Sequence, residues 1–96
     1  MNRTVKWSPA AKDEYARLLQ YLEQEYGTDS ALKFLEETDA VLFQISKFPN
    51  SGTPTKKERI RKSMITKQTS LFYELYEQEV KILHFWDNRQ DPNKLD

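Results

Sequence analysis

Hydrophobic positions change their spacing near the middle of this 96-residue chain. Up to Phe48 they recur every three or four residues, and beyond Thr55 the spacing shifts towards two. The first spacing is typical of helices with one apolar face and the second of strands. A short alternating run, Thr4-Val5-Lys6-Trp7, precedes the helical part and predicts a strand of its own.

The first helix is predicted to begin at Ser8-Pro9, because serine caps helix N-termini and proline is well tolerated at the first helical position. Gly27 is expected to end it, as a residue free to adopt a left-handed conformation. Its apolar face would be formed by Ala11, Tyr15, Leu18, Leu22 and Tyr26.

A second helix is expected after a connection of about three residues, capped by Thr28, Asp29 or Ser30 and stopped by Pro49. Two such helices form an antiparallel hairpin, and neither can bury its apolar face without another layer. The predicted apolar face of the second helix contains Ala31, Phe34, Leu35, Thr38, Val41, Leu42, Ile45 and Phe48.

The second half of the chain supplies that layer as an antiparallel meander. Residues 50–55 are predicted to be a loop, and strands are predicted near 60–65, 71–76 and 80–86, joined by short connections at 67–69 and 77–78. Strict alternation places Arg61 and Lys62 on opposite faces of their strand. In the last strand it places Val80, Ile82, His84 and Trp86 on one face and Lys81, Leu83 and Phe85 on the other.

The predicted fold is therefore α+β: a short N-terminal strand and a two-helix antiparallel hairpin packed on a mostly antiparallel, twisted sheet of about four strands. We expect one domain over residues 1–96, since a chain of this length buries one modest core. No apolar run approaches the ~20 residues of a membrane span, and the start of the chain lacks the apolar stretch of a secretory signal. With no cysteine to form disulfides, we expect a cytoplasmic protein and no contact with membranes.

Charge is balanced overall but clustered locally. The formal net charge is zero, which disfavours a strongly electrostatic nucleic-acid binder, yet residues 56–62 hold five cations in seven positions. Such a cluster is more often a solvated loop than a binding site.

Most catalytic and cofactor motifs are missing from the sequence. There is no phosphate-binding glycine loop, no His-Glu-x-x-His helix and no nucleophile elbow, and one histidine without cysteine makes a zinc site improbable. We therefore expect no metal and no cofactor.

The remaining candidates are cations beside a histidine. RNA cleavage by its own 2′-hydroxyl needs proton transfer and stabilisation of negative charge. His84 could transfer the proton and Arg61 could bind the phosphate, with Lys62, Lys67 and Arg89 adding positive charge. The alternative for His84 is a structural role between Leu83 and Phe85. Tyr73 and Trp86 could stack on bases, although aromatics in so small a domain are more often core residues.

The order of these elements resembles the RelE/ParE superfamily, the toxins of bacterial type II toxin–antitoxin pairs. The resemblance rests on residues 5–11, Phe48-Pro49, Arg61, residues 71–75 and residues 82–92, and so spans nearly the whole chain. It implies a cognate antitoxin that binds the toxin and occludes its toxic surface, with a hetero-oligomer as the resting form. It also implies one of two targets, DNA gyrase for ParE-like members or mRNA on the ribosome for RelE-like members.

Two departures separate this chain from the nuclease branch that the resemblance implies. Ribosome-dependent nucleases of the superfamily commonly carry a tyrosine just beyond the last strand, but no tyrosine follows Tyr76 here, and the chain is neutral rather than basic. The sequence therefore favours a ParE-like gyrase inhibitor. The alternatives are a metal-independent mRNA endoribonuclease using Arg61 and His84, and an inactive toxin homologue that acts only as a binding or regulatory partner.

Overall fold

In a computed structural model of the chain, residues 2–89 form a helical hairpin packed on one face of a five-stranded sheet. Residues 90–92 of the predicted C-terminal motif lie outside the described residues. The elements are, in chain order, β1 (Thr4–Trp7), α1 (Pro9–Tyr26), α2 (Thr28–Lys47), the 3-10 turn η1 (Pro49–Ser51), β2 (Thr53–Pro54), β3 (Ile60–Met64), β4 (Thr69–Leu75) and β5 (Glu79–Asp87).

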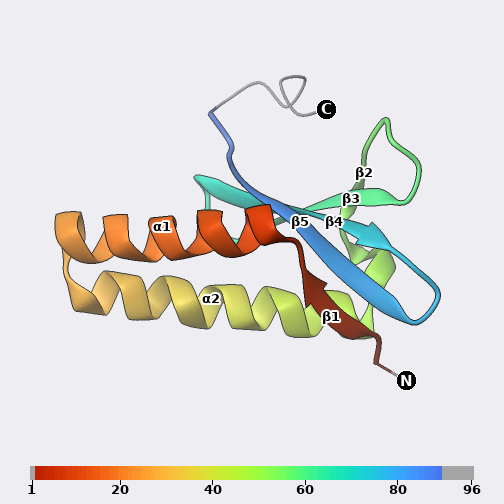
Figure 1. The fold of residues 1–96 in the computed structure, drawn as a ribbon, viewed down its shortest axis with the longest axis horizontal. Coiled ribbons are helices and arrows are strands. Elements are labelled where there is room, and N and C mark those ends of the chain that lie inside the picture. Colours follow the sequence, from red (N-terminus) through yellow and green to blue (C-terminus); the bar gives the residue numbers. More distant parts are fainter. Residues whose placement is uncertain (1, 90–96) are drawn as a thin grey trace.

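The helices begin and turn close to where the sequence predicts. The Ser8 hydroxyl accepts a hydrogen bond from the Ala11 backbone N–H (3.0 Å), and Pro9 occupies the first turn of α1. The connection is a single residue, Gly27, instead of the predicted three, because Thr28 is already helical. Gly27 can reverse the chain alone since it adopts φ +98°, which strains residues with a side chain. Figure 1 shows this turn projecting away from the sheet.

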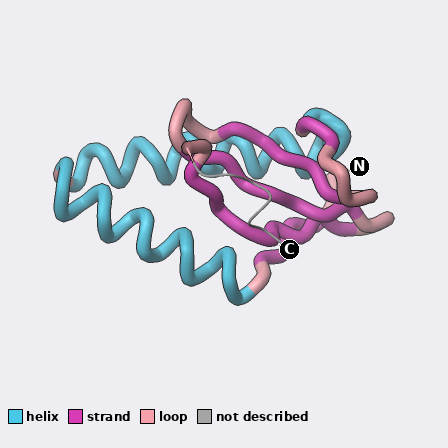
Figure 2. The backbone as a smooth tube through the Cα atoms, turned by 90° about the horizontal axis from the view of Figure 1, so that it is seen from above, coloured by secondary structure: helices cyan, strands magenta, loops and turns pink. Residues whose placement is uncertain are grey.

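The sheet is mixed, with strand order β1-β5-β4-β3-β2. β1 runs parallel to β5, and the other neighbours are antiparallel. Figure 2 shows the strands as a twisted layer beside the helices. The fifth strand, β2, lies in the stretch predicted to be a loop and pairs only two residues with β3. Its Pro54 suits an edge position, where a missing backbone N–H costs least.

The predicted alternation in the last strand is wrong beyond Ile82. Phe72 pairs with His84 while the next residue, Tyr73, pairs with Ile82, so Leu83 is an extra residue in β5. This β-bulge reverses the faces that follow it. Phe85 therefore joins Ile82 in the core, with 4% and 0% of their surfaces exposed, and His84 faces the other side of the sheet.

The core lies between the hairpin and the sheet and is joined by one aromatic cluster. The ring of Tyr15 stacks on Phe85 at 5.0 Å between centroids, and it also contacts Trp7 (5.2 Å) and Phe34 (5.9 Å). These side chains come from α1, β5, β1 and α2, so the cluster ties both layers together. The buried residues around it are Ala11, Ile45, Leu71, Tyr73, Val80 and Ile82. Neither helix in residues 2–89 is long and apolar enough to cross a membrane.

Candidate functional site

The face of the sheet opposite the helices carries a row of paired residues that includes two of the predicted site residues. Thr53, Lys62, Phe72 and His84 are cross-strand partners in sequence across β2, β3, β4 and β5. Because Leu71 and Tyr73 point into the core, Phe72 between them points to the opposite face. Lys62 and His84 thus lie on either side of Phe72.

This row crosses a groove that we call the lysine groove. Its volume is about 800 Å³, and it runs between the start of α1, β2 with the loop that follows, and the open face of β3, β4 and β5. It is lined by four lysines (Lys56, Lys57, Lys62 and Lys81) and by His84, and its apolar side chains include Pro9, Pro54, Ile60, Phe72 and Leu83. Among residues 2–89, no carboxylate and no arginine lines it.

His84 is held by a carboxylate from α1. Glu14 contacts the Nδ1 atom of His84 at 3.1 Å with one oxygen, and its other oxygen accepts a hydrogen bond from the Phe85 backbone N–H at 2.9 Å. An ionised carboxylate can only accept, so Nδ1 carries a proton and faces Glu14. The Nε2 atom at the other side of the ring has no partner among residues 2–89.

Side chains also satisfy the backbone hydrogen-bonding groups of β5 beyond the point where its pairing with β1 ends. Pairing between the two strands ends at Trp7 and Ile82, after which the chain turns into α1. Beyond that point the Ser8 hydroxyl donates to the Leu83 carbonyl (2.7 Å), and Glu14 accepts from Phe85. The side chains of Ser8 and Glu14 therefore take the place of the missing strand. Their hydrogen bonds hold the bulge and the His84 ring.

Arg61 lies elsewhere, in a cluster that anchors the turn before β2. Its Nη1 donates to the carbonyls of Asn50 (3.1 Å) and Gly52 (2.6 Å). The hydroxyl of Tyr73 accepts from the Gly52 N–H (3.0 Å) and donates to the Pro49 carbonyl (2.8 Å). Tyr73 is fully buried, so it presents no surface to a partner. Arg61 does not line the lysine groove.

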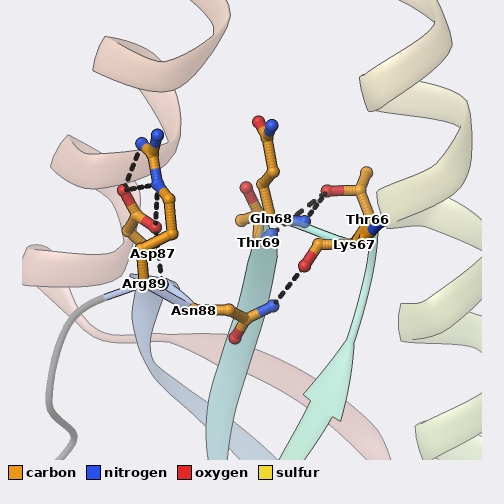
Figure 3. A network of polar contacts seen from close by, with 7 residues as sticks. All are labelled: Thr66, Lys67, Gln68, Thr69, Asp87, Asn88 and Arg89. Carbon is orange, nitrogen blue, oxygen red and sulfur yellow. Dashed lines mark hydrogen bonds and ion pairs between the residues drawn. The ribbon is translucent and has the colours of Figure 1, made fainter.

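Lys67, Trp86 and Arg89 line a second pocket, between the hairpin and the turn from β3 to β4. Figure 3 shows Arg89 paired with Asp87 through its Nη2 (2.7 Å), and Asn88 Nδ2 donating to the Lys67 carbonyl (3.2 Å). The Arg89 guanidinium, by hydrogen bonding, holds the pKa of the Asp87 carboxyl at about 2. This pocket has both signs of charge, because Glu14, Glu37 and Arg17 also line it.

The structure thus distributes the seven predicted residues over three places. Lys62 and His84 meet in the lysine groove, Lys67, Trp86 and Arg89 in the second pocket, and Arg61 and Tyr73 in the turn cluster. Sequence reasoning missed Glu14 and Lys81. Glu14 precedes the core residue Tyr15 on α1, but nothing in the sequence pairs it with a histidine 70 positions away. Within residues 2–89, no group of three histidine, cysteine or acidic residues could hold a metal ion.

A family model for the ParE toxin of the type II toxin–antitoxin system parDE matches residues 5–92. No curated protein is significantly similar to the chain in sequence.

Solved structures share the fold at low sequence identity. The chromosomal ParDE system from P. aeruginosa contains a chain with a TM-score of 0.75 and 16% identity, the match covering 88% of this chain and 95% of that one. The YoeB/ParE toxin from Agrobacterium tumefaciens gives a TM-score of 0.65, 13% identity and coverages of 88% and 98%. The E. coli DinJ-YafQ toxin–antitoxin complex contains a chain with a TM-score of 0.64 and 8% identity, the match covering 93% of this chain and 96% of that one.

Proposed function

Because the chain belongs to the ParE toxin family of type II toxin–antitoxin systems, we propose that it inhibits DNA gyrase through protein contacts and is held inactive by a cognate antitoxin. Its place of action would be the cytoplasm, where gyrase and DNA are found. The resting form would be a hetero-oligomer with the antitoxin, as the names of the P. aeruginosa and E. coli relatives indicate for those proteins.

The separation of Arg61 from His84 is the observation that favours gyrase over RNA. Cleavage of a phosphodiester needs the proton-transfer group and the phosphate-binding cation at the same phosphate. Arg61 instead donates to two backbone carbonyls in the turn before β2, and it does not share the lysine groove with His84. Arg61 bound in this way contributes to the fold and is not available as a phosphate clamp beside His84.

A metal-independent mRNA endoribonuclease is the second candidate, favoured by one arrangement. His84 is oriented by Glu14 with Nε2 left for a substrate, and Lys62 and Lys81 line the same groove. In this version His84 transfers the proton and the two lysines stabilise the charge, with Lys81 in the place given to Arg61 by the sequence. If the chain is an endoribonuclease, its toxicity requires the His84 imidazole.

Induced expression without antitoxin, with pulse labelling of DNA and protein synthesis, separates the two. We expect DNA synthesis to fall first, and purified protein to inhibit supercoiling by gyrase. His84→Gln should retain this inhibition, because no proton transfer is involved. Early arrest of protein synthesis that His84→Gln abolishes would instead establish the endoribonuclease, and unchanged growth would indicate an inactive homologue.

A further inference from the structure

We propose that the lysine groove of one copy of this chain binds the exposed side of α2 of a second copy, so that the free protein associates head to tail. The proposal goes beyond the toxin function and does not rest on it. It is carried by two surfaces of opposite charge, by the apolar side chains that both contain, and by their places on the fold.

The lysine groove is the positive surface of the pair. None of its four lysines belongs to an ion pair within residues 2–89. Lys62 and Lys81 lie half-buried on the strands, and Lys56 and Lys57 are exposed in the loop after β2. Like charges gathered in a concave surface raise the local potential, which attracts a surface of opposite sign. The groove is therefore suited to an acidic partner surface.

One side of α2 is the negative surface, which we call the α2 stripe. Five exposed residues at helical spacing share this side of the helix: Leu32, Leu35, Glu36, Asp39 and Phe43. The three apolar side chains are 53%, 37% and 60% exposed in that order. Glu36 and Asp39 belong to no ion pair within residues 2–89, and every charged residue between positions 34 and 46 is acidic. The α2 stripe is therefore both acidic and apolar, and it is open to solvent.

The two surfaces match in chemistry. A helix binds in a groove by placing apolar side chains, spaced three or four residues apart, against the apolar side chains of the groove. The leucines and the phenylalanine of the α2 stripe would lie on the apolar residues of the lysine groove, which include Pro54 and Ile60. Glu36 and Asp39 would contact Lys62 and the loop lysines. Such complementary charges set the orientation of a contact and exclude partners of the wrong sign.

The places of the two surfaces require a second copy of the chain. The helices pack on one face of the sheet, as Figure 2 shows, whereas the lysine groove lies on the open face, so α2 cannot reach the groove of its own chain. A contact between two different surfaces leaves one of each free in a dimer, and further copies can add in the same way. Zero net charge removes the repulsion that keeps copies of a protein apart.

Sedimentation velocity of the purified full chain tests the proposal. The sedimentation coefficient should rise with protein concentration, and added salt should reduce this rise by screening the charges. Lys62→Glu should weaken association at least about tenfold. The α2 variant carrying Leu32→Ala and Phe43→Ala should weaken it in the same direction. A loop variant carrying Lys56→Glu and Lys57→Glu leaves the strands intact and repeats the test of the groove.

Lys12→Glu and Tyr26→Ala are the matched controls, because both residues are exposed and lie outside the lysine groove and the α2 stripe. We expect both controls to associate like the wild type.

Mixing two variants shows whether the contact joins different surfaces. Lys62→Glu keeps its α2 stripe, and the α2 variant keeps its lysine groove. An equimolar mixture should therefore form a complex of one copy of each and grow no further. A wild-type chain that stays monomeric at every concentration would overturn the proposal, and so would controls that weaken association equally. Association lost in the α2 variant but intact in both groove variants would instead show that α2 packs against α2.

Discussion

At the scale of single residues, Tyr73 has the core role that the sequence offered as the more common alternative to base stacking. Its ring is fully buried and its hydroxyl joins the Gly52 N–H to the Pro49 carbonyl. Arg61, the cross-strand partner of Tyr73, binds the same turn through the Asn50 and Gly52 carbonyls. The turn before β2 therefore depends on two side chains from the sheet.

Tyr73→Phe should lower the free energy of unfolding by about 1–3 kcal/mol, because it leaves the buried Gly52 N–H without an acceptor. Urea denaturation measures the change. Tyr76→Phe is the control, since that hydroxyl is exposed and bonds only to Glu74, and we expect a change within about 0.5 kcal/mol. Equal effects of the two substitutions would show that the hydrogen bonds of the Tyr73 hydroxyl to the turn do not contribute to the free energy of unfolding.

Tyr73 should also make the free energy of unfolding fall at alkaline pH. Burial raises the pKa of the Tyr73 phenol above its ordinary value of 10.0, and the hydrogen bond from Gly52 opposes this only in part. The unfolded chain therefore loses this proton first, at about pH 10, so stability is intact below that pH and falls as pH rises towards the folded pKa. Urea midpoints from about pH 8 to about pH 11 should decline less steeply in Tyr73→Phe than in the wild type. A parallel decline would contradict the assignment.

Gly52→Ala should destabilise the same turn through overlap. A Cβ atom at Gly52 would collide with the Tyr73 hydroxyl and lie 2.9 Å from the Lys62 carbonyl, which is backbone and cannot swing away. Overpacking of this kind costs about 1–3 kcal/mol, measured as a fall in the urea midpoint. At Gly27 an added Cβ meets nothing within 4 Å, so Gly27→Ala isolates the cost of the positive φ, which is about 1 kcal/mol.

At the scale of elements, the edge of β5 is completed by α1 instead of a strand. Glu14→Ala should remove the acceptor for the Phe85 N–H and cost about 1–3 kcal/mol, with faster hydrogen exchange of that amide. Glu14→Gln keeps the acceptor but turns an N–H₂ group towards His84, so we expect the imidazole to change to the Nε2–H tautomer. Nitrogen chemical shifts of the ring report this change, and unchanged shifts would show that Glu14 does not fix the tautomer.

Local sequence signals predicted most elements because those signals are themselves physical. Ser8-Pro9 caps α1 whatever lies elsewhere, and the apolar spacing of α2 specifies its buried face. The bulge at Leu83 has no such signal, since it arises from pairing between β4 and β5. The composition of the candidate site depends on it. Alternation correctly separated Arg61 from Lys62, but only the bulge places His84 on the face of Lys62.

At the scale of the whole molecule, one aromatic cluster joins the hairpin to the sheet. Phe85→Ala should cost about 3–5 kcal/mol, because the ring is 4% exposed, stacks on Tyr15 and contacts Trp7. That is a large part of the ~5–15 kcal/mol typical of a domain. Helix loss, followed by circular dichroism, and tryptophan fluorescence should change together. Phe43→Ala, at a ring 60% exposed, should change little, and separate transitions would contradict a single core.

The parallel pairing of β1 with β5 also determines when the protein can exist in active form during its synthesis. Thr4–Trp7 pairs with residues 79–82, so β1, the first strand to be synthesised, cannot form its sheet hydrogen bonds until β5, the last strand, has been made. The helical hairpin can form earlier from local contacts, but its apolar face stays uncovered until β4 and β5 follow. A ribosome that stalls before residue 79 therefore releases a fragment without the His84 face of the sheet, and truncated translation products of this toxin should be harmless.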